Sequence, residues 1–237
     1  LVHSLINLTI KLKLKKQIFF VEQIENINSY LKKADIGILS SNEEGFSAAV
    51  VRLSTNKDQL RMLLSLLNTV LKEEASIWVI GANDEGIKSF PKTAKGYVKD
   101  VETIDIRQRA RLLHGTRAEQ QSTLQNWMET HPIVLDGQSV EWNTFPGVFA
   151  KGRLDSGTDY LLSVLADYPI KRTFQLADFA CGTGVIARWL ADRFPEAQID
   201  AMDSDSWAIE LAKLNAPTVK HRLVDGWIGM PRDRRYD

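Results

Sequence analysis

The chain has 237 residues, of which 44% are hydrophobic and 25% are charged, values typical of a globular protein with one large or two small cores. Thirty basic residues balance thirty acidic ones, so no global electrostatic field draws the chain to nucleic acid or membrane, although a local basic patch would suffice for RNA. One cysteine and four scattered histidines exclude an intrachain disulfide framework and lack metal-site spacing, which predicts no metal and a reducing compartment such as the cytoplasm.

The first 24 residues are apolar at both ends, but four lysines interrupt them: Lys11, Lys13, Lys15 and Lys16. No run approaches the roughly 18 apolar residues of a membrane span, and the order of basic and apolar residues is wrong for a signal peptide. We therefore expect no membrane association. The chain begins at Leu1 and stops at Asp237 without a closing helix or tail, a pattern typical of a fragment.

Strand-like and helix-like segments alternate in the first part of the chain. Strands are predicted at 17–21, 35–40, 50–53 and 76–81, and helices at 27–33 and 57–72. The second of these helices has one apolar face, formed by Leu60, Leu63, Leu64, Leu67 and Leu71. This alternation predicts βαβ units and a mostly parallel sheet.

Residues 118–146 differ in character, with a polar helix-like stretch followed by the hairpin signal Asp136-Gly137, and we interpret them as a connection. Alternation resumes beyond it. Helices are predicted at 157–166, 185–194 and 206–215, and strands at 174–179, 198–202 and 219–224, with Tyr236 beginning a further strand. The sequence therefore predicts an α/β chain of two consecutive doubly wound units.

The stretch Asp178-Phe179-Ala180-Cys181-Gly182-Thr183-Gly184 joins a predicted strand to a predicted helix. Ligands of such sheets bind at the carboxyl ends of the strands. Gly182 and Gly184 let the backbone approach a ligand closely, and the helix that follows offers free amides to a carboxylate. The spacing fits a dinucleotide G-x-G-x-x-G motif poorly. Cys181 is interpreted as a small residue that lines the turn and not as a nucleophile.

Acidic residues also end the next two predicted strands. Asp203 is placed to accept hydrogen bonds from both ribose hydroxyls of a nucleoside, or else to cap the helix from Ser206. Asp225 is placed to accept from an adenine amino group, and Trp227 either stacks on the ring or only packs. Asp178 alone can be a simple turn residue, but the ordered set across three strand ends favours a nucleoside-type ligand.

From about residue 49 to 237 the chain resembles the ribosomal RNA guanine-N2 methyltransferases of the small subunit and their large-subunit relatives. The matching stretches are 49–57, 78–89 and, most specifically, 145–158 followed by 161–163. The resemblance implies two tandem Rossmann-like, class I methyltransferase-like units. The first is degenerate in that family and helps with RNA or folding. The second binds S-adenosylmethionine and methylates a guanine exocyclic amine.

The resemblance carries functional roles onto particular residues. It implies cofactor contacts for Asp178, Ala180, Gly182, Gly184, Asp203, Asp225 and Trp227, and a pocket-lining role for Asp155, Gly157 and Thr158. Alternatively, Asp155 or Ser156 merely caps the helix that follows. The family commonly has glycine where Ala180 stands. Its acceptor site is an Asn-Pro-Pro-aromatic loop after a fourth strand, which is absent before Asp237. The second unit is thus expected to be truncated after about its third strand, the catalytic residues are unassigned, and we expect no methyl transfer by this polypeptide.

Residues 1–48 instead resemble the donor-binding half of retaining GT-B glycosyltransferases. In those enzymes the glutamate equivalent to Glu44 is followed eight positions later by a second glutamate, and here that position is Arg52. We therefore predict a fusion: a glycosyltransferase-like piece at 1–48, the rest of a degenerate methyltransferase-like domain at 49–117, a connection at 118–146, and a cofactor-binding domain at 147–237. The alternative is a divergent methyltransferase amino terminus.

Three functions follow from these patterns. The first is an S-adenosylmethionine-dependent methyltransferase of ribosomal RNA or the small ribosomal subunit. The others are a glycosyltransferase fragment and a non-catalytic module that binds RNA or cofactor. Two arginine clusters are either phosphate contacts or solvated surface: Arg107, Arg109 and Arg111, and Arg232, Arg234 and Arg235. The sequence does not define the target nucleotide or the oligomeric state.

Overall fold

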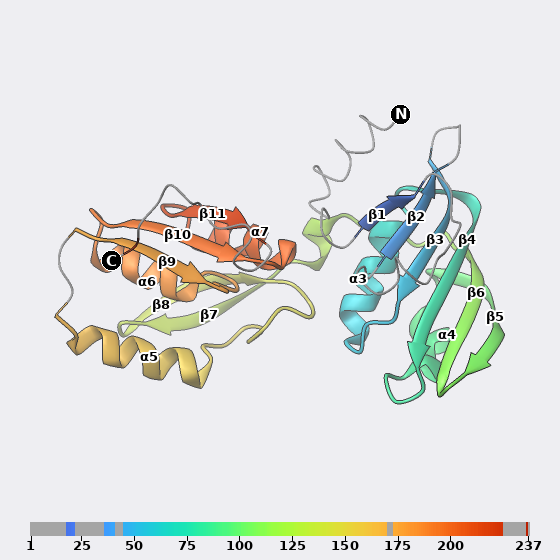
Figure 1. Cartoon of the computed structure of the whole chain (residues 1–237), viewed down its shortest axis with the longest axis horizontal. Helices are drawn as coiled ribbons and strands as arrows, with labels where there is room; N and C mark the ends of the chain where they lie inside the picture. Colours follow the sequence, from blue (N-terminus) through green and yellow to red (C-terminus); the bar gives the residue numbers. More distant parts are fainter. Residues whose placement is uncertain (1–17, 22–35, 41–44, 170–172, 225–235, 237) are drawn as a thin grey trace. The chain divides into compact units, whose positions relative to one another are not determined.

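The computed structural model describes residues 18–21, 36–40, 45–169, 173–224 and 236. The chain divides into two compact units, Leu1–Trp127 and Met128–Asp237 (Figure 1). Both units combine helices with a sheet, which confirms the predicted α/β class. None of the helices within the described ranges is long and apolar enough to cross a membrane.

The first unit is built on a six-stranded sheet with the order β1-β2-β3-β4-β6-β5. Its strands are β1 (Ile18–Val21), β2 (Ile36–Ser40), β3 (Phe46–Arg52), β4 (Leu71–Ala82), β5 (Val98–Arg107) and β6 (Ala110–Arg117). β1 pairs with β2 and β3 with β4 in parallel, whereas the pairs β2–β3, β4–β6 and β5–β6 are antiparallel. The prediction of a mostly parallel sheet is therefore wrong for this unit. β3 runs antiparallel to β2, and β5 and β6, which no local sequence pattern indicates, add an antiparallel hairpin.

Helix α3 (Lys57–Leu67) begins where predicted, because the side chain of Asn56 accepts hydrogen bonds from the amides of Asp58 and Gln59. It ends five residues earlier than predicted. Asn68, which is buried, caps the helix and donates through its side chain to the carbonyls of Tyr97, Ala118 and Gln120. Leu71 is the first residue of β4 and pairs with Phe46. The regular leucine spacing that predicted a helix to residue 72 therefore extends past the end of the helix into a strand. The short helices η1 (Ile87–Ser89), α4 (Phe90–Thr93) and η2 (Leu124–Trp127) complete this unit, and the helix predicted at 27–33 lies outside the described residues.

The second unit begins with a hairpin, β7 (Glu129–Leu135) and β8 (Gln138–Thr144), joined by Asp136 and Gly137 at positive φ. Helix α5 (Ser156–Asp167) follows. The hairpin is more than a connection, because Ile133, Leu135 and Trp142 belong to the hydrophobic core of this unit. The stretch before it, predicted to be helix-like, contains only η2.

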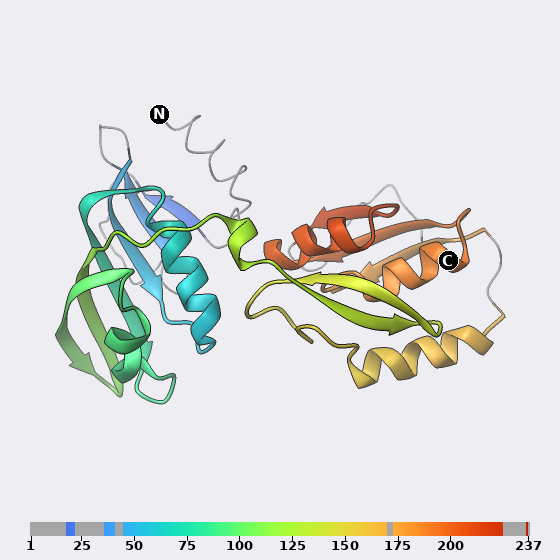
Figure 2. The same cartoon turned by 180° about the vertical axis from the view of Figure 1, so that it is seen from behind.

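The rest of the unit is a parallel sheet of order β11-β10-β9 with its crossover helices. These elements are β9 (Gln175–Phe179), α6 (Val185–Arg193), β10 (Gln198–Asp203), α7 (Ser206–Asn215) and β11 (Lys220–Leu223). Both helices lie on one face of the sheet, and Figure 2 shows the hairpin next to them. In the described part of the chain β9 pairs only with β10. Tyr236, predicted to begin a fourth strand, is not in a strand, and its hydroxyl instead donates to Asp200 Oδ2 (2.8 Å).

Candidate functional site

The turn between β9 and α6 has a left-handed backbone at three of its five residues. Ala180, Gly182 and Gly184 have φ values of +60°, +54° and +90°. A Cβ added to Gly184 would lie 3.2 Å from the Cβ of Ala212, so this glycine permits close packing against α7. Among the residues that the structure describes, a Cβ added to Gly182 would meet nothing within 4 Å. The turn is therefore packed at Gly184 and open at Gly182, as a backbone that accepts a ligand must be.

Backbone hydrogen bonds tie this turn to the neighbouring strand. Parallel pairing sets Phe179 of β9 opposite Met202 of β10, so the two strands end together. The amide of Cys181 donates to the carbonyl of Met202, and the amide of Gly184 donates to the carbonyl of Cys181, both at 2.9 Å. The turn thus has a defined position relative to the end of β10.

Asp203, the last residue of β10, is partly exposed and holds the turn through its side chain. Its Oδ2 accepts from the amide of Gly182 (2.9 Å) and its Oδ1 from the amide of Asp205 (2.8 Å). The N-cap of α7 is Asp205, which accepts from the amide of Trp207, so the capping alternative for Asp203 is wrong. Because an ionised carboxylate has about four acceptor sites, Asp203 can still accept hydrogen bonds from a ligand.

Asp178 is buried beneath the turn, with 6% of its surface exposed. Its Oδ2 accepts from the amide of Ala187 (3.1 Å), in the first turn of α6. Gly184 caps this helix without a side chain, so Asp178 supplies the carboxylate at the helix N-terminus. Burial raises the pKa of Asp178 to about 6, the Ala187 hydrogen bond opposes this shift, and the negative charge of Asp203 adds to it. The amide of Ala187, one of the helix amides expected to face a ligand, thus donates to Asp178 of the protein itself.

Asp155 begins α5 and caps it. Its Oδ2 accepts from the amides of Gly157 (3.0 Å) and Thr158 (3.1 Å), which confirms the capping alternative. A capping carboxylate can also face a ligand, so the pocket-lining role of these three residues stays a prediction. Asp225 and Trp227 lie outside the described residues.

The remaining candidates of the sequence analysis have ordinary structural surroundings. Cys181 is buried, and desolvation raises the pKa of its thiol, which therefore stays protonated and a poor nucleophile near neutral pH. Arg107 pairs with Asp105 (2.7 Å), and Arg111 donates to the side chain of Asn83 (2.9 Å). The second arginine cluster lies outside the described residues.

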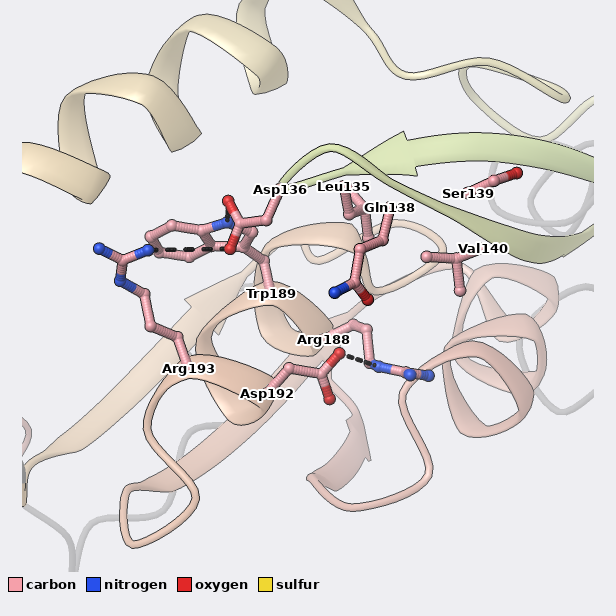
Figure 3. Close-up of a pocket in the computed structure, with 9 residues that line it drawn as sticks. All are labelled: Leu135, Asp136, Gln138, Ser139, Val140, Arg188, Trp189, Asp192 and Arg193. Atoms are coloured by element: carbon pink, nitrogen blue, oxygen red, sulfur yellow. Dashed lines mark hydrogen bonds and ion pairs between the residues drawn. The ribbon is translucent and has the colours of Figure 1, made fainter.

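A cavity of about 500 Å³ lies between the hairpin and α6, separate from the predicted site residues (Figure 3). Its charges are paired within the protein: Arg188 with Asp192 (2.6 Å) and Arg193 with Asp136 (3.8 Å). The indole of Trp189 donates to Asp136 (2.7 Å), and Arg193 also lies over the Trp189 ring. The four charged side chains balance, so we assign no ligand to this cavity.

Sequence reasoning missed two residues that contact the turn, Trp142 of β8 and Asn215 at the end of α7. Trp142 donates to the Thr183 hydroxyl, and Asn215 donates to the Thr183 carbonyl. Both contacts span more than 30 residues of sequence, and no local pattern indicates them.

The fold is α/β, and the turn after β9 lies at the carboxyl ends of β9 and β10, where it is bonded to Asp203. Two family models match the chain: Methyltransferase small domain at residues 139–227, and Methyltransferase small domain N-terminal at residues 7–131. The N-terminal model alone covers more than half of the sequence. The chain therefore belongs to the small-domain methyltransferase family.

Within this family the chain is similar to proteins named Ribosomal RNA small subunit methyltransferase C. It is 30% identical to the protein of Psychromonas ingrahamii over 175 residues, which are 73% of this chain and 49% of the relative. It is 31% identical to the protein of a Marinomonas species over 174 residues, 71% of this chain and 49% of the relative. The chain thus spans about half the length of these curated relatives.

A solved structure shares the fold of this chain. It is a T. thermophilus 16S rRNA guanine-N2 methyltransferase in complex with AdoMet and guanosine. The match has a TM-score of 0.70 and 14% identity, and it covers 83% of this chain and 55% of the other.

These comparisons also bear on the first 48 residues. The N-terminal family model begins at residue 7 and runs through the junction predicted near residue 48. Strand β3 likewise spans this position, from Phe46 to Arg52, and pairs with strands on both sides of the junction. Both findings favour the divergent methyltransferase amino terminus over the glycosyltransferase fusion.

Proposed function

We propose that this chain forms the S-adenosylmethionine-binding part of a methyltransferase that modifies a guanine exocyclic amine in small-subunit ribosomal RNA. The proposal is supported by the family, by relatives named as small-subunit ribosomal RNA methyltransferases, and by a fold neighbour that is a 16S rRNA guanine-N2 methyltransferase solved with AdoMet and guanosine. It includes a cytoplasmic location, where ribosomal substrates are found.

The observation that carries the proposal is the hydrogen bond from the Gly182 amide to Asp203 Oδ2. It brings a carboxylate with remaining acceptor sites beside a backbone segment that is open to a ligand. The described residues therefore fit a nucleoside with a charged tail: Asp203 accepts from the ribose hydroxyls, and Gly182 allows close approach.

The charges at the turn suit a cationic ligand. Asp178 and Asp203 lie near enough for the charge of Asp203 to raise the pKa of Asp178. S-adenosylmethionine has a positive sulfonium and a positive amine, which offset this negative field. When bound, the cofactor supplies an activated methyl group. The task of the protein is then chiefly to align the acceptor nitrogen and stabilise charge.

The other site residues complete the proposed pocket. Ala180 adopts a left-handed conformation, with a φ of +60°, at the position where the resemblance implies glycine. Asp155, Gly157 and Thr158 line the pocket from the start of α5, Asp225 accepts from the adenine amino group, and Trp227 lies against the ring. In this proposal the cofactor-binding domain of residues 147–237 works together with the preceding hairpin, and the first unit assists with RNA or folding.

Calorimetry with S-adenosylmethionine, S-adenosylhomocysteine and a uridine-diphosphate sugar tests the cofactor assignment. We expect binding of both adenosyl compounds and none of the sugar nucleotide; the reverse selectivity would overturn the proposal. Transfer of labelled methyl groups to undermethylated small subunits then distinguishes an enzyme from a binding module. Incorporation would show that the chain positions an acceptor, whereas cofactor binding without incorporation would indicate a module that needs further residues.

A further inference from the structure

Thr183, between the two glycines of the turn, is bonded through its side chain to the β7–β8 hairpin. The indole Nε1 of Trp142 donates to Thr183 Oγ1 at 2.9 Å. Trp142 is a core residue with 3% of its surface exposed, so its N–H has little access to water and needs this acceptor.

The main-chain carbonyl of Thr183 is held as well, by the side chain of Asn215. The Oδ1 of Asn215 accepts from the backbone N–H of Asn143 (2.9 Å), and its Nδ2 donates to the backbone carbonyl of Asn143 (3.0 Å). The side chain thus pairs with β8 as a neighbouring strand would. Its Nδ2 also donates to the Thr183 carbonyl (3.2 Å). Asn215 is 3% exposed, and the paired bonds to β8 fix the orientation of its amide.

These contacts matter because the turn has an unusual backbone. Gly182 and Gly184 adopt positive φ without strain, but the same freedom allows them other conformations, so contacts with neighbouring residues are needed to hold the turn in this one. Asp203 holds the turn at Gly182, and Trp142 and Asn215 hold it at Thr183. Two independent sets of contacts therefore determine where the Gly182 backbone lies.

We propose that Trp142 and Asn215 are positioning residues of the cofactor site, and that the β7–β8 hairpin is a working part of that site. They act through Thr183 and do not themselves touch the cofactor. The inference rests on the proposed function of the turn in binding S-adenosylmethionine. It goes further in assigning the hairpin, which precedes the cofactor-binding motif by about 40 residues of sequence, a role in cofactor affinity.

The test measures S-adenosylhomocysteine affinity by calorimetry on the full 237-residue chain. Thr183→Val keeps the side-chain shape but removes the acceptor of Trp142, and Thr183→Ser restores it. Trp142→Phe removes the donor. We expect Thr183→Val and Trp142→Phe each to weaken binding by roughly tenfold, and Thr183→Ser to stay within about twofold of the wild type. The double variant should lose no more than either single one, because both remove the same bond.

The matched control is Trp189→Phe, which also removes a buried indole donor. This donor bonds to Asp136, between β7 and β8, and does not contact residues 180–184 through that bond. We expect it to lower stability without changing affinity. Hydrogen exchange at residues 180–184 should rise in Trp142→Phe and not in the control. Unchanged affinity in Thr183→Val and Trp142→Phe, with binding by the wild type, would overturn this inference alone. Absence of binding by the wild type would overturn the proposed function and this inference together.

Discussion

The amide of Gly182 donates to the Oδ2 of Asp203 at 2.9 Å, and this bond joins the turn after β9 to the end of β10. The same carboxylate is held through its Oδ1 by the amide of Asp205. Its position is therefore fixed by backbone on both sides, while its remaining acceptor sites stay available. A carboxylate fixed before the ligand arrives loses little side-chain entropy on binding, which favours affinity.

The two glycines of the turn should separate stability from binding. Gly184→Ala places a Cβ 3.2 Å from Ala212 at a φ of +90°, and we expect the free energy of unfolding to fall by about 3 kcal/mol. The added methyl group of Gly182→Ala would enter open space at a φ of +54°, so this substitution should lower the free energy of unfolding by only about 1 kcal/mol. Its methyl group enters the space proposed for the ligand, so affinity for S-adenosylhomocysteine should fall steeply. Urea unfolding and calorimetry measure the two effects, and a Gly182→Ala variant that binds like the wild type would contradict the site.

Asp178 should make stability depend on pH. Burial raises its pKa from 3.8 to about 6, so the folded protein binds a proton more tightly than the unfolded chain. The stability contribution of this group is fully present below about pH 4 and is lost as pH rises to about 6, a change of roughly 3 kcal/mol. Asp178→Asn, which stays neutral and can still accept from Ala187, should thus be more stable than the wild type at pH 8 and similar at pH 4.

Unfolding by urea across this pH range measures the difference between the two proteins. Asp192→Asn is the control, because Asp192 is exposed and pairs with Arg188 on the surface of α6. This variant shows how much the change from carboxylate to amide alters stability at an exposed position. If the stability difference between Asp178→Asn and the wild type does not change with pH, ionisation of the buried Asp178 carboxyl does not destabilise the fold.

Two substitutions at Asp155 distinguish its roles. Asparagine caps helices as well as aspartate, so Asp155→Asn should leave stability unchanged, whereas Asp155→Ala should cost about 1 kcal/mol. If the carboxylate also lines the pocket, both variants should weaken S-adenosylhomocysteine binding severalfold, because each loses the negative charge. Equal affinity of Asp155→Asn and wild type, measured by calorimetry, would restrict this residue to capping.

The second unit could be predicted closely from sequence because glycine, proline and acidic residues mark its element ends. The helix predicted at 206–215 is α7, and the strand predicted at 174–179 differs from β9 by one residue. The positions of Asp178, Gly182 and Asp203 at strand ends predict them as site residues. Their contacts are now defined, and Asp178 lies beneath the turn as a helix-capping group.

The missed features depend on contacts distant in sequence. The local sequence of residues 98–117 does not indicate strands, yet β6 pairs with β4 from Ser76 to Ala82. The leucine period at 57–72 could not reveal that Leu71 pairs with Phe46. The contacts of Trp142 and Asn215 with the turn were missed for the same reason.

The central claim, that the turn after β9 and the carboxylate ending β10 form a cofactor site, is tested most directly by one comparison. S-adenosylhomocysteine affinity is measured calorimetrically for the wild type, Asp203→Ala and Asp205→Ala. Asp205 is two residues away and caps α7, so its loss should lower stability by about 1 kcal/mol and leave binding intact. We expect saturable binding by the wild type and Asp205→Ala, and none detectable for folded Asp203→Ala. Equal binding by all three proteins would contradict it.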